Sequence, residues 1–220
     1  MKSLHTYINE RLITNKDEIL LCPKSKDELV DAILDHFKHG DSDLNNIDVS
    51  KLKKEDFNSL FYNLRNEIKK NNITEIDISK WKLKELYYDT RKNKGMFEQC
   101  ETLESIILPG CLEVIGKYTF YKCTKLNNIT IPNSVTTIDD VAFSNCSSLE
   151  NITIPDSVTK IGNYTFYCCS DLTSVVISSL VTSIGGYAFY GCNTLKITVP
   201  NKDIKKLVKY SGFDGKIIVK

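Results

Sequence analysis

The side chains best able to perform chemistry are few, and their spacing argues against catalysis. The three histidines, His5, His36 and His39, all precede residue 40. A serine or cysteine nucleophile needs a neighbouring base, most often histidine, and neither GxSxG nor HExxH occurs. His36 and His39 share a helical face but would need further ligands to hold a metal, so we expect them to be solvated. We predict a protein that is not an enzyme, with no small-molecule substrate, cofactor or metal.

Eight cysteines raise the question of disulfides or zinc. Five of them recur at intervals of 23 residues: Cys100, Cys123, Cys146, Cys169 and Cys192. No pair has the CxxC spacing of a structural zinc site. The odd number of repeating cysteines opposes mutual pairing, so we expect buried, reduced thiols that pack as small apolar groups. The redox states of Cys22, Cys111 and Cys168 stay open.

Charge and hydropathy exclude two further classes. The 220 residues carry a net charge of +1, so no overall field attracts nucleic acid or anionic membrane. The longest apolar runs fall far short of the roughly 20 residues that span a bilayer, so we expect no membrane insertion. The first 15 residues lack the apolar core of a signal peptide. We therefore expect a cytoplasmic location, or the cell surface if an upstream signal was removed.

Self-similarity at 23 residues is the main signal in the sequence. The leucine column comprises Leu103, Leu126, Leu149, Leu172 and Leu195, and the phenylalanine column comprises Phe120, Phe143, Phe166 and Phe189. Within one unit Ile129 and Ile131 alternate with polar residues, which predicts a short half-buried strand that Pro132 ends. Phe143 and Cys146 are three residues apart, which predicts a single helical or 3₁₀ turn.

A single unit of this kind cannot bury its apolar side chains alone. Stacked neighbours must complete the core and align the strands into a parallel ladder. The predicted fold is therefore an α/β repeat solenoid, with single glycines such as Gly162 and acidic pairs such as Asp139 and Asp140 in its turns. We expect the glycines to serve the turn and these carboxylates to be solvated.

The segments LNNITIPNSVTTIDDVAFSNCSS and LENITIPDSVTKIGNYTFYCCSD resemble the BspA-type (Treponema-type) leucine-rich repeat. The resemblance covers residues 103–200. It implies a parallel-stranded solenoid that binds proteins, often in bacterial surface, phage or protozoan proteins, and it brings no catalytic residues. Upstream, LNNIDVS and ITEIDIS match the strand pattern in longer units. DISKWKL with GMFEQC is similar to a related repeat of bacterial surface proteins and mobile elements, although residues 84–94 interrupt it.

The chain divides into four predicted regions. Residues 1–43 form a helical N-terminal cap, with helices over 4–13 and 26–39, and residues 44–102 form degenerate longer repeats that include a helix after Ser50. Residues 103–200 are the regular repeats. Residues 201–220 form a helix-strand C-terminal cap, in which Asn201 is the N-cap of a helix and KIIVK is a strand.

Three surfaces are candidates for binding a partner. The outward strand positions are small and mostly polar: Asn128, Thr130, Asn151, Thr153, Ser174 and Val176. The turns carry tyrosine pairs: Tyr118 and Tyr121, Tyr164 and Tyr167, Tyr187 and Tyr190. The closing helix carries a candidate basic contact made by Lys202, Lys205, Lys206 and Lys209, within a segment that holds six lysines and two aspartates.

The leading functional interpretation is a non-enzymatic leucine-rich repeat module that binds another protein. One alternative is a small inhibitor, encoded by a phage or mobile element, whose basic helix engages a host nucleic-acid-processing defence enzyme or another nucleoprotein. The other alternative is a fragment of a bacterial surface adhesin. The sequence leaves the partner, the host, the oligomeric state and the ranking of the three surfaces open.

Overall fold

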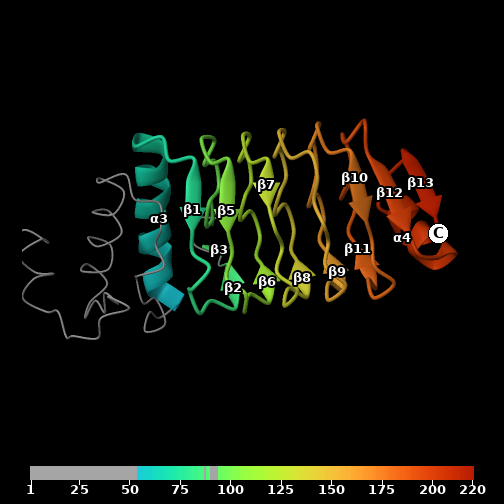
Figure 1. Ribbon diagram of the computed structural model, residues 1–220, viewed down its shortest axis with the longest axis horizontal. Coiled ribbons are helices and arrows are strands. Elements are labelled where there is room, and N and C mark those ends of the chain that lie inside the picture. The colour runs from blue at the N-terminus through green and yellow to red at the C-terminus, as the bar shows by residue number, and fades with distance from the viewer. Residues whose placement is uncertain (1–53, 87, 90–93) are drawn as a thin grey trace, which may run out of the picture.

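A computed structural model describes residues 54–86, 88–89 and 94–220, with side chains described in full from Lys94 onward. The chain winds into a solenoid of five coils that run side by side along one axis (Figure 1). This confirms the predicted parallel-strand repeat fold. The predicted cap over residues 1–43, the upstream strand LNNIDVS and Cys22 lie outside the described residues.

Each coil passes through two ladders, and every coil but the fourth contributes a strand to both. The first ladder contains β1 (Glu75–Asp77), β5 (Ser105–Ile107), β7 (Asn128–Ile129), β10 (Ser174–Val176), β12 (Lys196–Val199) and β13 (Lys216–Val219). The second contains β2 (Glu85–Leu86), β6 (Val114–Ile115), β8 (Thr137–Ile138), β9 (Lys160–Ile161) and β11 (Ser183–Ile184). All pairings within both ladders are parallel. The first ladder consists of two three-stranded sheets, β1–β5–β7 and β10–β12–β13, and the fourth coil between them pairs only through a single bridge from Asn151 to Ser174.

The 23-residue repeat interval sets the register in which neighbouring strands pair. Ser105 pairs with Asn128, and Thr137 pairs with Lys160, so residues 23 apart lie side by side. The phenylalanine column therefore stacks through the core: ring centroids lie 5.5, 5.1, 5.4 and 5.4 Å apart from Phe97 to Phe189, with planes within 16° of parallel. The leucine and repeating cysteine side chains are buried beside them.

The turn after each second strand differs from the predicted helical or 3₁₀ turn. Cys146 N–H still donates to Phe143 O at 3.1 Å, which is the expected local bond. Val141 and Asn145, however, have φ of 61° in the left-handed region, and this breaks any helix. Phe143 N–H turns outward and donates to Thr165 O of the next coil at 2.8 Å. The prediction was wrong because spacing alone does not reveal that bonding to the neighbouring coil can outweigh a local helix.

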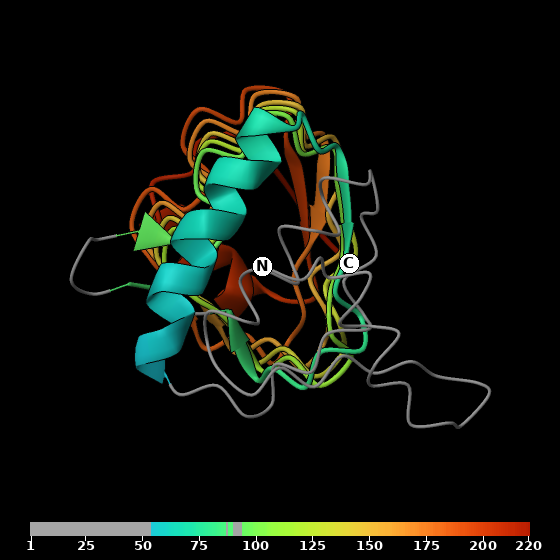
Figure 2. The same cartoon turned by 90° about the vertical axis from the view of Figure 1, so that its left-hand side faces the viewer.

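The interrupted first unit still completes its coil. β2 pairs with β6, as the second strands of the other coils pair with their neighbours. Within the insertion, β3 (Tyr88–Asp89) and β4 (Lys94–Gly95) form an antiparallel hairpin. Figure 2 shows this hairpin projecting from the side opposite the first ladder. Helix α3 (Lys54–Lys70) lies at the N-terminal end of the described array and buries Phe61, Leu64 and Ile68.

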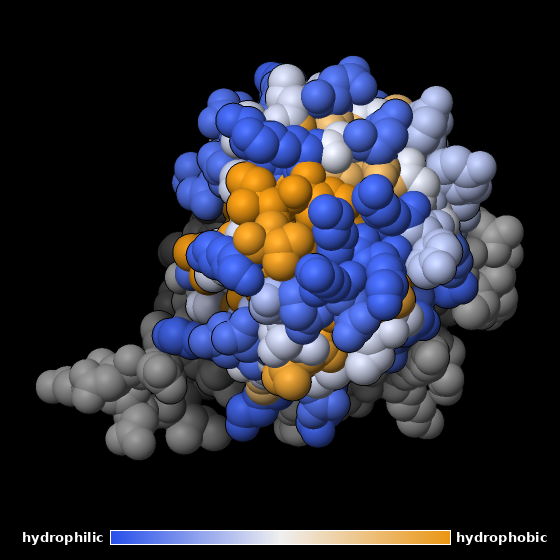
Figure 3. Space-filling view, turned by 90° about the vertical axis from the view of Figure 1, so that its right-hand side faces the viewer, coloured by the Kyte–Doolittle hydropathy of each residue, from blue (hydrophilic) through white to orange (hydrophobic). Residues whose placement is uncertain are grey.

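At the other end the predicted helix and strand are present. Helix α4 (Lys202–Tyr210) begins at the N-cap Asn201, whose side chain accepts bonds from two backbone N–H groups, as predicted. It buries Ile204 and Val208, and β13 then adds a last parallel strand beside β12. Figure 3 shows apolar surface among hydrophilic side chains at this end, where β13 leaves Ile218 and Val219 each 40% exposed.

Candidate binding surfaces

Two of the three tyrosine pairs form a stacked, exposed surface. Tyr164 stacks on Tyr187 at 5.4 Å and Tyr167 stacks on Tyr190 at 5.5 Å, because residues 23 apart occupy the same place in successive turns. Within each coil the two rings meet edge to face. We call these four residues the tyrosine cluster. Tyr164, Tyr187 and Tyr190 are 42–51% exposed, so a rigid set of ring edges and hydroxyl groups faces solvent.

The third tyrosine pair, Tyr118 and Tyr121, does not belong to the tyrosine cluster. Tyr118 and Tyr121 lie edge to face with each other at 5.7 Å, two coils away from Tyr164 and Tyr167. The coil between them has Val141 and Ser144 at the corresponding positions. This coil interrupts the aromatic rows, so Tyr118 and Tyr121 are separate from the tyrosine cluster. Both are half-buried.

The outward strand positions form a flat polar face, which we call the strand face. Asn128, Thr130, Asn151 and Thr153 are exposed, with the buried Ile129 and Ile152 between them. Ser174 is exposed as well, and Val176 is 50% exposed. The structure therefore places all six predicted residues on one side of the first ladder.

The predicted basic contact on α4 is smaller than its sequence suggests. Lys206 pairs with Asp203 at 2.9 Å, one helical turn away, and this raises the pKa of the lysine. Lys205 is half-buried. Of the four lysines, only Lys202 and Lys209 are both exposed and without an ion-pair partner among the described residues.

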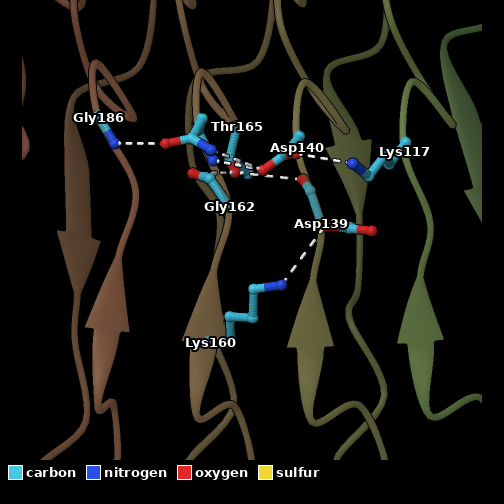
Figure 4. A network of polar contacts seen from close by, with 8 residues as sticks. Lys117, Asp139, Asp140, Lys160, Gly162, Thr165 and Gly186 are labelled. Atoms are coloured by element: carbon cyan, nitrogen blue, oxygen red, sulfur yellow. Dashed lines mark hydrogen bonds and ion pairs between the residues drawn. The ribbon is translucent and has the colours of Figure 1, made fainter.

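A polar ladder that the sequence analysis missed connects four coils (Figure 4). Asp140 accepts a bond from Lys117 at 3.0 Å on one side, and from the backbone and side-chain nitrogens of Asn163 at 2.8 and 3.1 Å on the other. Asn163 in turn accepts a bond from the backbone N–H of Gly186 at 2.8 Å. These four residues share one column of the repeat. The expectation that Asp140 is merely solvated was wrong, because stacking brings three donors to it.

Asp140 also makes the stability of the array depend on pH. Partial burial alone would raise the pKa of its carboxyl, but the bonds from Asn163 and Lys117 outweigh burial and hold the pKa below its ordinary value. A carboxyl with a lowered folded-state pKa stabilises the fold above its unfolded-state pKa, about 3.9, and loses that contribution as pH falls through the folded value. We expect Asp140→Asn to lower the free energy of unfolding by about 1 kcal/mol at pH 7.

The matched measurement is urea unfolding of both proteins at pH 7 and at pH 3. The difference between them should shrink at pH 3, where the native carboxylate is being protonated. An equal difference at both values would mean that the charge of Asp140 contributes nothing.

The cysteine column has a structural role. Four of its five thiols donate to a phenylalanine carbonyl of the preceding coil, as Cys146 does to Phe120 O at 3.1 Å and Cys192 does to Phe166 O at 3.0 Å. Burial raises the pKa of the Cys100 thiol to about 12, so the nucleophilic thiolate is suppressed. No disulfide joins the cysteines of the described segments.

Comparison with known proteins identifies the repeat. A model of the BspA type leucine-rich repeat region matches residues 90–216 in six copies, which is more than half of the chain. The chain belongs to the BspA-type leucine-rich repeat family. The strands, stacked phenylalanines and buried cysteines described above are thus the repeating core of a BspA-type array.

Three solved structures resemble this BspA-type chain. A leucine-rich repeat protein from Bacteroides ovatus is 33% identical over 57% of the chain, with a TM-score of 0.50. The T. pallidum leucine-rich repeat protein is 23% identical over 68% of this chain and 88% of its own, with a TM-score of 0.53. The pneumococcal vaccine antigen PcpA is 22% identical over 69% of this chain and 42% of its own, with a TM-score of 0.53. The last two show the fold alone.

The chain spans about a third of the length of the Bacteroides ovatus protein, since the match covers 31% of it. No curated protein matches the chain. In the part of the chain that the structure describes, no helix has the length and apolarity needed to cross a membrane. The same residues contain no group of three or more histidine, cysteine or acidic side chains arranged to hold a metal ion.

Proposed function

We propose that this chain is a non-enzymatic module that binds another protein, and that the tyrosine cluster is its main contact. One observation carries the proposal: Tyr187 and Tyr190 are each about half exposed while their rings are fixed by stacking on the preceding coil. Tyrosine is enriched among the residues that dominate binding energy, because it combines apolar area with a hydrogen-bonding hydroxyl. A surface already held in place loses little conformational entropy on binding.

The cluster is continuous with the end of α4. Tyr187 N–H donates to Ser211 O at 2.6 Å, and Tyr210 beside it is 85% exposed. We propose that this exposed aromatic residue on the helix extends the contact surface of the four on the turns. The strand face offers short side chains and fewer anchors by comparison, so we do not place the contact with the partner there.

An inhibitor of a nucleic-acid-processing enzyme, acting in the cytoplasm, is the second candidate. The exposed and unpaired Lys202 and Lys209 favour it, since lysine side chains can contact phosphate or an acidic protein surface. The ion pair between Lys206 and Asp203 weakens it, because it removes one of the four predicted contacts.

One experiment separates the two candidates. The full chain is immobilised and proteins captured from extracts of its host are quantified by mass spectrometry, in parallel with Tyr187→Ser/Tyr190→Ser and Lys202→Glu/Lys209→Glu variants. We expect the tyrosine variant to lose the captured partner and the lysine variant to keep it, with no effect of nuclease. Loss with the lysine variant alone, together with sensitivity to nuclease, would support the inhibitor instead. Circular dichroism of each variant checks that the fold is intact.

A further inference from the structure

The strand face carries an ordered charge pattern along the solenoid. Its first ladder has seven rungs, and pairing register and repeat interval place one outward residue of each rung in a row, which we call the first outward row: Glu75, Ser105, Asn128, Asn151, Ser174, Lys196 and Lys216. The row is acidic at its first rung, neutral through the middle and basic at the last two rungs. Glu75 and Lys196 are exposed and have no ion-pair partner among the described residues.

The second outward row lies two residues further along each strand: Asp77, Ile107, Thr130, Thr153, Val176, Thr198 and Ile218. It exposes two large apolar side chains within the first six rungs. Ile107 on the second rung is 56% exposed and Val176 on the fifth rung is 50% exposed. These two residues are equally many rungs from the midpoint between the third and fourth rungs. Glu75 on the first rung and Lys196 on the sixth are also equally far from that midpoint.

We infer that a second copy of this chain packs on the strand face, related by a two-fold axis that runs along the strands between the third and fourth rungs. Rotation about this axis reverses the order of the rungs but keeps each position along the strand at the same level. The first rung then faces the sixth, the second faces the fifth and the third faces the fourth. Each outward row meets the same row of the other copy.

This single operation matches the charged ends of the first outward row and the exposed apolar residues within the first six rungs of the second. Glu75 meets Lys196, and Ile107 meets Val176, each twice because a two-fold interface is self-complementary. Asn128 meets Asn151 in the centre, where amides supply both donors and acceptors. Two independent properties, charge and exposed apolar area, thus give the same axis. The self-matching pattern is what favours a second copy over an unrelated protein.

The packing is also sterically reasonable. Sheets pack face to face about 10 Å apart when the side chains between them are short, and the central Asn and Thr positions meet that requirement. Figure 2 shows that α3 and the β3–β4 hairpin lie away from the first ladder, so these elements leave the face uncovered. Six rungs about 4.8 Å apart give an interface smaller than the roughly 1,200 Å² typical of stable complexes, so the dimer is weak.

Sedimentation velocity of the full chain tests the inference. We expect the mass to rise from the monomer value of 25.0 kDa towards the dimer as the protein is concentrated. The charge reversals Glu75→Lys and Lys196→Glu should each weaken the dimer at least about tenfold, because each places two like-charged pairs across the interface. A 1:1 mixture of these two variants should dimerise again, since every contact in the mixed dimer joins a lysine to a glutamate.

The mixture makes the outcome decisive. Misfolding of either variant cannot produce dimers in the mixture. Recovery of the dimer is predicted only by an interface that brings residue 75 of one copy to residue 196 of the other. The variant Lys202→Glu, which reverses a charge on α4, is the matched control and should dimerise as the unmodified chain does. A chain that stays monomeric at about 1 mM, or a mixture that stays monomeric, would overturn the inference. These results are independent of the tyrosine cluster and its partner.

Discussion

Replacing Phe143 by alanine should lower the free energy of unfolding by about 3–5 kcal/mol, the range for truncating a buried aromatic ring. Phe143 is fully buried and stacks on Phe120 at 5.1 Å and on Phe166 at 5.4 Å. Its loss leaves a cavity at the centre of the array, flanked on both sides by rings whose backbones are tied to neighbouring coils. Urea unfolding monitored by circular dichroism measures the effect.

Tyr190→Ala is the matched control, because it also truncates a ring that stacks on a neighbour but is 51% exposed. We expect that variant to lose only about 1 kcal/mol, the size of an aromatic pair contribution. Equal losses for Phe143→Ala and Tyr190→Ala would contradict a core built on the phenylalanine column.

Replacing Gly162 by alanine should cost about 1–3 kcal/mol, in spite of adding only one methyl group. A Cβ at this position would lie 2.4 Å from the backbone nitrogen of Asp140 in the preceding coil. Backbone atoms held in the ladder cannot turn aside as a flexible side chain can, so the two coils must separate locally. Thermal and urea unfolding both report this loss.

Gly110→Ala provides the control for Gly162→Ala. Nothing lies within 4 Å of a Cβ added at Gly110, so its substitution should change the stability little. If both alanine variants were equally stable, the close approach of neighbouring coils at Gly162 would not constrain the fold.

Much of the array was predictable because each core column repeats at a fixed interval. The 23-residue spacing of Phe143 and Phe166 gives the stacking of coils, and the alternation around Ile129 gives the inward and outward positions of the first ladder. The helix starting after Asn201 was predictable from its cap and its apolar spacing. These features depend on local pattern and on burial, which a single sequence displays.

Contacts between coils were harder to predict. The sequence indicated only a turn for the glycines after the second strand, but at Gly162 and Gly185 the backbone of the preceding coil lies 2.4 Å from the position that a Cβ would occupy. Asp140 was expected to be solvated because its donors, Lys117 and Asn163, are each 23 residues away. The complementary halves of the strand face likewise become visible only once the register orders its residues into rows.

The turns also give the solenoid a direction. Tyr118, Phe120 and Lys122 all donate their N–H groups forward to carbonyls of the next coil. Elsewhere in the coil bonds run backward, as from Thr136 N–H to Glu113 O, so it is in these turns that the first end of the array presents acceptors and the last end presents donors. The two flanking segments correspond to this difference: Arg65 of α3 donates to Gly95 O at the first end, and Ser211 O accepts from Tyr187 at the last.

Each flanking segment consequently fits one end only. Whole coils can be added to or removed from the interior without changing the kind of contact made at any junction, because every regular junction repeats the same set of forward and backward bonds. Two arrays cannot be joined first end to first end, or last end to last end, with the bonds that join neighbouring coils. The length of the molecule is adjustable in steps of one coil, as in a polar filament assembled from identical subunits.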